Sequence, residues 1–227
     1  MKKVAIFDID GTLFRSSLLI EITRALVREG IFPLQAEKIY LRAYKDWFSR
    51  KGSYEKYISA VITAFEKYIK GVGRGDFLKV ARKVIAFNQN RVYRYTRDLI
   101  KELRKKNYYI LAISHSPWEI LKDFCKKSGF DKVYGQVHEV GKSGKFTGKV
   151  VYLELINDKA KILKRAVEKE GLTLKDSIGV GDTQGDIPFL KMVAKPICFN
   201  PNKKLFEYAK RQGWKVVFER KDVIYPL

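Results

Sequence analysis

The apolar run KVAIF at residues 3–7 is followed at once by DIDGT, which places two carboxylates, Asp8 and Asp10, next to Gly11. The run has the length and composition of a buried β-strand. Two like charges at the end of such a strand repel one another unless a cation or a ligand compensates them. An Asp-Gly pair also favours a simple turn. The segment therefore predicts either a turn or a charged site at a strand end.

Short β-prone runs recur along the chain, and segments with helical periodicity separate most of them. This alternation predicts a parallel sheet covered by helices. We therefore expect the α/β class with a Rossmann-like parallel-sheet core. The β-prone runs are residues 3–7, 107–113, 176–180, 194–199 and 215–218.

Residues 16–90 break this alternation, because they contain no convincing strand. We expect an inserted α-helical cap domain there, resembling a four-helix bundle, and an α/β core domain made of residues 1–15 and 91–227. The linkers near residues 14–16 and 88–91 are the expected hinges. The helical stretches of the insert lie near residues 16–29, 34–50, 53–70 and 75–90.

Two glycine-containing segments invite comparison with phosphate-binding loops. GVGRG at residues 71–75 has no preceding strand and lacks the Lys-Ser/Thr ending of a P-loop, so we expect an interhelical loop. GKSGK at residues 141–145 has that ending, but Gln136 stands where the first glycine of the motif is required. The segment is predicted to be the polar tip of a β-hairpin.

Ligands of doubly wound sheets bind at the carboxyl ends of the strands. The polar residues just after the predicted strands are Asp8, Asp10, Ser114, Asp182 and Asp186. Converging carboxylates raise one another's pKa unless a cation is present, and hard oxygen ligands select Mg²⁺. Such a site suits phosphoryl transfer, with one Asp forming an aspartyl-phosphate and another acting as general acid and base.

Four segments, in order along the chain, resemble the haloacid dehalogenase-like phosphatases. They are DIDGTL at residues 8–13, Ser114 after YYILAI, Lys159 in NDKAKIL, and GVGDTQGDIPFL at residues 179–190. The first and last are the specific ones, and this family inserts a helical cap between the first two. The hairpin YGQVHEVGKSGKFTGKV resembles that of the phosphoserine-phosphatase-like branch, subfamily IB.

The resemblance implies a Mg²⁺-dependent phosphatase that hydrolyses a small-molecule phosphomonoester. Asp8 would be the nucleophile, and Asp10 the general acid and base that also offers its backbone carbonyl to Mg²⁺. The metal ligands so implied are Asp8, Asp10 and Asp182, with Asp186 beside them. Mg²⁺ between these groups would explain why two carboxylates are tolerated at one strand end.

The same resemblance implies that Ser114 and Lys159 bind the substrate phosphate, with Thr12 as a support near the acid and base. Lys159 is near a predicted helix start, where its charge opposes the helix dipole unless a phosphate is bound. A solvated lysine and an N-capping role for Asp186 are the structural alternatives. Ser116 belongs to SPWE at residues 116–119, a capping box with Pro at the first helical position, which predicts a structural role.

The ester itself is left open by two departures from the phosphoserine phosphatases that the chain resembles. Ser17 stands where they carry an acidic residue for the substrate amine, and Glu21 lies about one helical turn further on. His115 stands where a glycine usually follows the serine, and we expect it to line the pocket. His138, on the hairpin, is predicted to be exposed.

The formal net charge is +21, with 46 Lys and Arg against 25 Asp and Glu, which favours anionic substrates or partners. The basic, Tyr-rich insert leaves open a second function, nucleic-acid binding on an inactive phosphatase scaffold. The alternative interpretation is that the insert has solvated helix faces over an apolar stripe. In that case we expect Arg42, Trp47 and Arg50 to face the substrate, a small phosphorylated metabolite.

The N-terminal apolar run is too short and too soon acidic for a signal sequence, and no run reaches membrane-spanning length. We therefore expect a cytoplasmic protein without membrane contact. Cys125 and Cys198 lie far apart and lack the spacing of a zinc site, so free thiols are expected.

Overall fold

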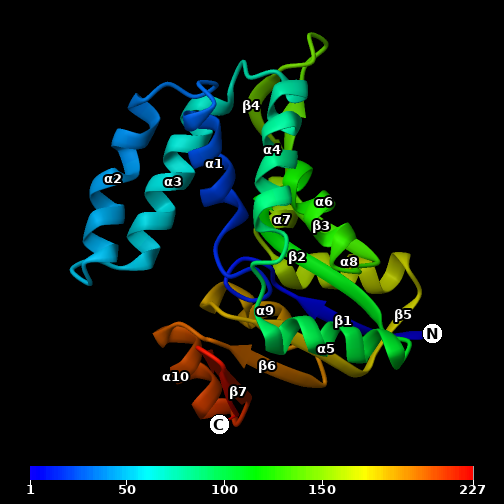
Figure 1. Ribbon diagram of the computed structural model, residues 1–227. Helices are drawn as coiled ribbons and strands as arrows, with labels where there is room; N and C mark the ends of the chain where they lie inside the picture. The colour runs from blue at the N-terminus through cyan, green and yellow to red at the C-terminus, as the bar shows by residue number, and fades with distance from the viewer. Residues whose placement is uncertain (227) are drawn as a thin grey trace.

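A mostly parallel sheet forms the centre of the computed structural model, which describes residues 1–226 (Figure 1). Its eight strands have the order β4-β3-β2-β1-β5-β6-β7-β8, and only the outermost pairs, β3 with β4 and β7 with β8, are antiparallel. The strands are β1 (Lys2–Phe7), β2 (Tyr109–Pro117), β3 (Lys132–Val140), β4 (Phe146–Val151), β5 (Leu172–Gly181), β6 (Lys195–Phe199), β7 (Lys215–Arg220) and β8 (Val223–Pro226).

Strand β1 lies between β2 and β5, and its last residues are fully buried. Phe7 pairs with Ala112 of β2 and with Val180 of β5. Strand β1 ends at this level and β5 ends one residue later, whereas β2 continues to Pro117. This register brings the residues that follow Phe7, Ala112 and Val180 to one place at the edge of the sheet.

Alternate residues of β1 pack into two separate cores, as the two-residue period of a strand requires. Ala5 and Phe7 face one core, and Val4 and Ile6 face the other. The helices that cover these faces are α5 (Arg94–Lys105) and α6 (Trp118–Lys127) on the first, and α8 (Lys159–Lys169), α9 (Ile187–Leu190) and α10 (Lys203–Gln212) on the second.

A bundle of four helices stands outside the sheet, between β1 and α5 (Figure 1). These helices begin and end within about two residues of the predicted stretches, and we propose residues 16–90 as the cap domain. The α/β class with an inserted helical cap is confirmed. The bundle consists of α1 (Leu18–Arg28), α2 (Gln35–Phe48), α3 (Tyr54–Ile69) and α4 (Arg74–Asn88).

Helix α3 shows why the insert folds as a bundle. Its buried residues, Tyr57, Val61, Ala64, Phe65 and Ile69, recur every three or four positions and form one apolar stripe. The remaining positions are largely polar and solvent-facing. Within residues 1–226, no helix is both long enough and apolar enough to cross a membrane.

The two predicted linkers lie side by side. Arg15 N–H donates to the carbonyl of Arg91 at 3.0 Å, and Tyr93 N–H donates to the carbonyl of Leu13 at 2.9 Å. The backbones of the two linkers are therefore joined directly by hydrogen bonds. Their role as hinges stays a prediction.

A third connection between cap and core was not predicted. The loop between α3 and α4 pairs with the β3–β4 hairpin: Phe146 donates its N–H to Val72 and accepts one from Gly71, at 2.9 and 2.8 Å, and Arg74 N–H donates to Gly144 at 2.9 Å. The interhelical loop and the hairpin tip, both predicted correctly as turns, are thus hydrogen-bonded to each other. The hairpin is part of the cap's support.

Candidate active site

Asp8 continues the sheet beyond β1, because its N–H donates to the carbonyl of Val180 at 2.9 Å. The chain then turns sharply at Gly11, which has a φ of +85°. A Cβ atom at Gly11 would lie 2.2 Å from Oδ2 of Asp182. Position 11 therefore requires glycine for two reasons: its backbone conformation and the close approach of the Asp182 loop.

Lys159, the first residue of α8, is buried and bridges two carboxylates. Its ammonium group donates to Oδ1 of Asp8 at 2.7 Å and to Oδ1 of Asp186 at 2.6 Å. The solvated-lysine alternative is wrong, because only 4% of the residue is exposed. Oδ2 of Asp8 is buried and has no hydrogen-bond partner within residues 1–226. Asp8 is thus fixed through one oxygen and free on the other.

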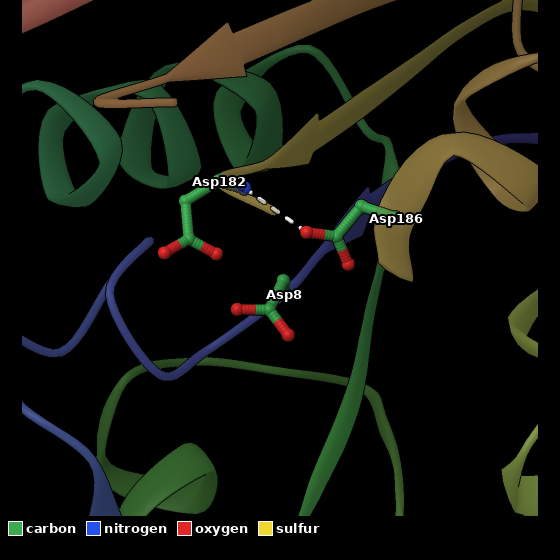
Figure 2. Close-up of side chains that lie close together, drawn as sticks. All are labelled: Asp8, Asp182 and Asp186. Atoms are coloured by element: carbon green, nitrogen blue, oxygen red, sulfur yellow. Dashed lines mark hydrogen bonds between the residues drawn. The ribbon is translucent and has the colours of Figure 1, made fainter. Parts of the chain in front are cut away.

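Figure 2 shows Asp8, Asp182 and Asp186 with their carboxylates gathered around one space. One oxygen of each lies within 4.8 Å of the others. Asp186 also accepts the N–H groups of Asp182 and Thr183, both at 3.0 Å, so its second oxygen is engaged. The capping alternative assigned Asp186 to the start of the helix IPFL, but its side chain makes no capping bond there. It caps the short turn that begins at Thr183 instead. Asp186 therefore holds the Asp182 loop and Lys159 in place.

The charges of this group do not balance. Burial raises the pKa of Asp8 to about 7, although Lys159 opposes the shift. Burial and the neighbouring charges of Asp8 and Asp186 raise the pKa of Asp182 well above its usual range. Burial lowers the pKa of Lys159, but Asp186 and Asp8 outweigh it and the net shift is upward. One ammonium group among three carboxylates leaves room for a further cation.

The carboxylate of Asp10 has a different environment. Its Oδ1 accepts the N–H of Leu18 at 2.6 Å, and its Oδ2 accepts the hydroxyls of Ser114 and Ser116 at 2.6 and 2.8 Å. These contacts hold its side chain apart from the group formed by Asp8, Asp182 and Asp186. If Asp10 contacts a metal, its backbone carbonyl is the available group, as the sequence resemblance implies.

The predicted capping role of Ser116 is wrong. Strand β2 continues to Pro117, which pairs with Gln136 of β3 and occupies the N-cap position of α6. Ser116 therefore lies in the strand, and its hydroxyl reaches Asp10. The sequence SPWE matches the capping pattern, but pairing with β3 decides where the strand ends.

The structure brings the other predicted phosphate residues to the same strand ends. Ser114 is fully buried next to Asp10, and Thr12 is fully buried with its hydroxyl donating to Oδ1 of Asp182 at 3.4 Å. His115, between the two serines, is exposed. The contacts support the predicted neighbourhood of Thr12, Ser114 and Lys159, whose roles toward a phosphate stay predictions.

The prediction that His138 is exposed is wrong. Only 4% of it is accessible, and its ring lies 5.3 Å from that of Phe65 and 6.2 Å from that of Phe146, between ring centroids. Its Nε2 has no hydrogen-bond partner within residues 1–226. The hairpin packs against α3, so its inner face is covered by the cap.

The aromatic residues of the insert pack largely against one another. Trp47 stacks on Tyr57 with ring centroids 5.5 Å apart, and Tyr57 is 2% exposed. Arg42 and Arg50 are exposed. This packing favours the interpretation as solvated helix faces over an apolar stripe.

Sequence reasoning missed Tyr54, at the start of α3. Its neighbour Glu55 lies 3.6 Å from Lys204 of α10, and Asn202 N–H donates to the carbonyl of Asp182 at 2.8 Å. The tip between α2 and α3 therefore reaches the loop that carries Asp182. Partial burial and the charges of Asp10, Asp182 and Asp8 accordingly raise the pKa of Tyr54. Its only signal in the sequence is its place just after Gly52 and Ser53, at a helix start.

Comparison with known proteins agrees with this geometry. A family model described as haloacid dehalogenase-like hydrolase matches residues 5–191. Histidinol-phosphatase of Neisseria meningitidis is 25% identical over 96% of this chain and 99% of its own length. Phosphoserine phosphatase of Methanocaldococcus jannaschii is 27% identical over 87% of this chain and 85% of its own.

The fold is similar as well. A structure solved as a phospho-aspartyl intermediate analogue of phosphoserine phosphatase superposes with a TM-score of 0.63, at 23% identity, over 97% of this chain and 95% of that one. Because the family model covers most of the chain, the chain belongs to the haloacid dehalogenase-like hydrolases.

Proposed function

We propose that this haloacid dehalogenase-like hydrolase is a Mg²⁺-dependent phosphatase, which cleaves a small-molecule phosphomonoester through a covalent aspartyl-phosphate on Asp8. One observation carries the proposal. Asp8 is buried at a strand end, Lys159 binds its Oδ1, and its Oδ2 has no hydrogen-bond partner within residues 1–226. A buried carboxylate that a lysine holds in place, and that keeps one oxygen without a hydrogen-bond partner, can offer one oxygen to phosphorus and the other to a metal ion.

Mg²⁺ fits the residues that are present. Asp8 offers an unpartnered oxygen close to the carboxylate of Asp182, and burial raises the pKa of both groups, so a bound cation would stabilise their ionised forms. Asp8 and Asp182 would hold the ion together with the backbone carbonyl of Asp10, and Asp186 would keep the Asp182 loop in position. When bound, the ion neutralises charge on the phosphoryl oxygens.

The reaction then has two steps. A carboxylate oxygen of Asp8 bonds to phosphorus while the bond to the ester oxygen breaks, and protonated Asp10 gives its proton to the leaving oxygen. Asp10, now ionised, takes a proton from water, whose oxygen bonds to phosphorus as the bond to Asp8 breaks. Inorganic phosphate leaves, and both aspartates return to their initial states.

Three further residues are proposed to hold the phosphoryl group. Lys159 already carries its charge at Asp8, and Ser114 places a hydroxyl next to Asp10. Thr12, bonded to Asp182, would support the same edge of the site. A cation and hydroxyl donors at the strand ends suit a group whose charge is spread over three oxygens.

The proposed substrate is a small phosphorylated metabolite, and phosphoserine is the first to test because relatives bear the name phosphoserine phosphatase. The surroundings of Glu21 argue against phosphoserine as the substrate. Arg91 lies 3.0 Å from Glu21, and the hydroxyl of Ser16 donates to the same carboxylate at 2.8 Å. Glu21 is therefore already compensated and is a poor receptor for a substrate amine. Histidinol phosphate belongs on the same panel, since a relative is named for it.

Phosphate release from a panel of esters, with and without Mg²⁺, tests the proposal. The panel contains phosphoserine, histidinol phosphate, sugar phosphates, nucleotides and p-nitrophenyl phosphate. Asp8→Asn should abolish release while circular dichroism stays unchanged, and the control Asp98→Asn, at an exposed aspartate that pairs with Arg97, should remain active. Asp10→Asn enzyme that is acid-quenched during reaction with p-nitrophenyl phosphate, which needs no acid to form the intermediate, should retain a phosphoryl group on the peptide that contains Asp8.

Full activity of Asp8→Asn would contradict the mechanism. No release from any ester, together with salt-dependent RNA or DNA binding that survives Asp8→Asn, would favour the nucleic-acid alternative.

We place the proposed reaction in the cytoplasm, as the sequence led us to expect.

A further inference from the structure

The hydroxyl of Ser116 makes two hydrogen bonds at the boundary between the core and the cap. It is 2% exposed, its hydroxyl donates to Oδ2 of Asp10 at 2.8 Å, and the same hydroxyl accepts the N–H of Leu19 at 3.2 Å. Leu19 is in the first turn of α1, which is the first helix of the cap. A single hydroxyl thus joins the end of β2, the general acid and the cap.

Asp10 makes the second contact to the same turn. Its Oδ1 accepts the N–H of Leu18 at 2.6 Å, whereas Ser17, at the N-cap position of α1, makes no side-chain capping bond. The first N–H groups of a helix need external partners. Asp10 and Ser116 supply two of them, for Leu18 and Leu19, so the proposed general acid and its serine cap the first helix of the cap domain.

A hydroxyl is suited to this position for a chemical reason. Asp10 is protonated in one proposed step and ionised in the other. The hydroxyl of Ser116 can donate to Oδ2 of Asp10 in both states, because the acidic proton must lie on the side of the carboxyl group that faces the leaving oxygen. A methyl group could not donate, and the carboxylate would lose one of the contacts that fix its orientation.

We propose that Ser116 is a positioning residue for Asp10: its hydroxyl holds the carboxylate against the first turn of α1, in the orientation from which the proton reaches the leaving oxygen. The inference rests on the proposed function. It adds a residue outside the phosphate contacts assigned to Thr12, Ser114 and Lys159.

The test compares esters whose leaving groups differ in how strongly they require a proton from Asp10. An alkoxide is a poor leaving group and requires the acid, whereas p-nitrophenolate leaves without one. The ratio kcat/KM reports the first chemical step, in which Asp10 acts as the acid, and excludes the later hydrolysis that all esters share. The two esters to compare are p-nitrophenyl phosphate and the fastest alkyl ester of the panel.

Ser116→Ala should lower kcat/KM for the alkyl ester about tenfold more than for p-nitrophenyl phosphate. Ser116→Thr, which keeps the hydroxyl, should restore much of the difference. Ser116→Cys preserves the side-chain volume but donates weakly, so it should behave as Ser116→Ala and provides a folded variant if the alanine variant unfolds.

Ser177→Ala is the matched control. Ser177 is also fully buried, and its hydroxyl also donates one hydrogen bond, to Leu174, and accepts one, from Ala194. It should lower kcat/KM equally for both esters or not at all. An equal loss for both esters in Ser116→Ala and Ser116→Cys would overturn the positioning role while leaving the phosphatase intact. Inactivity of the wild-type protein on every ester would overturn the proposed function, and this inference with it.

Discussion

Lys159 lies 2.7 Å from one oxygen of Asp8, and no hydrogen-bond donor within residues 1–226 reaches the other oxygen. The ammonium group is also 2.6 Å from Asp186, so it is the main compensation for two buried carboxylates. Removing one partner of a buried ion pair is costly, because the remaining charge is left without compensation. The stability of this edge of the sheet should therefore depend on Lys159.

We expect Lys159→Met to lower the free energy of unfolding by about 3–5 kcal/mol at pH 8, in addition to abolishing activity. The loss should be smaller at pH 6, where Asp8 can take up a proton, and added Mg²⁺ should recover part of it. Urea denaturation at both pH values, with and without Mg²⁺, measures this. Lys79→Met, at an exposed lysine that pairs with Asp76, is the control and should change stability little. Equal losses in the two variants would contradict the prediction.

Binding of Mg²⁺ should strengthen as the pH rises through 7. Burial raises the pKa of Asp8 to about 7, so below this pH the ion must displace a proton. The rise in Tm caused by Mg²⁺ should therefore be larger at pH 8 than at pH 6. Asp182→Asn should remove most of it at both pH values. A Mg²⁺-induced shift of the same size at pH 6 and pH 8 would show that Asp8 is not the group that loses the proton.

Gly11 and Gly71 allow the backbone effect to be separated from the effect on the site. Both have a φ of +85°, but a Cβ at Gly71 would meet no atom within 4 Å, whereas one at Gly11 would lie 2.2 Å from Asp182. In each alanine variant, backbone strain should lower the free energy of unfolding by roughly 1 kcal/mol. Only Gly11→Ala should also displace Asp182 and raise the Mg²⁺ concentration needed for half-maximal phosphate release. Equal Mg²⁺ requirements in the two variants would refute the role given to this contact.

The sequence was sufficient to predict which side chains meet at this edge of the sheet, because their placement depends on local pattern and on one rule of sheet topology; their roles in the reaction stay predictions. Asp8, Ser114 and Asp182 each follow a β-prone run, and parallel strands bring their carboxyl ends together. Lys159 could be identified only through the family resemblance, since a lysine near a helix start has no distinctive local pattern.

Ser116, His138 and Tyr54 could not be assigned correctly, because their surroundings are set by contacts between distant segments. Strand pairing between Pro117 and Gln136 keeps Ser116 in β2. His138 is covered because the hairpin that carries it packs on α3. The contact between Glu55 and Lys204 brings the cap tip with Tyr54 toward the Asp182 loop. None of these pairings can be derived from the spacing of residues along one segment.

His138 should make the protein less stable as the pH falls. Burial lowers its pKa to about 4, against an unperturbed value of about 6.5, although the backbone of Gln136 opposes the shift. The unfolded chain therefore binds a proton between these pH values and the folded protein does not. The contribution of His138 is fully present above pH 6.5, decreases as the pH falls, and is lost by pH 4, with a total change of about 3 kcal/mol.

The raised pKa of Asp8 acts in the opposite direction over part of this range, because the folded protein then binds a proton that the unfolded chain does not. The informative quantity is therefore the difference between the wild type and His138→Leu, measured by urea denaturation from pH 7.5 to pH 4.5. The wild type should lose stability relative to the variant as the pH falls below 6.5. Parallel pH profiles for the two proteins would mean that His138 is accessible to protons in the folded state, for example through opening of the hairpin away from α3.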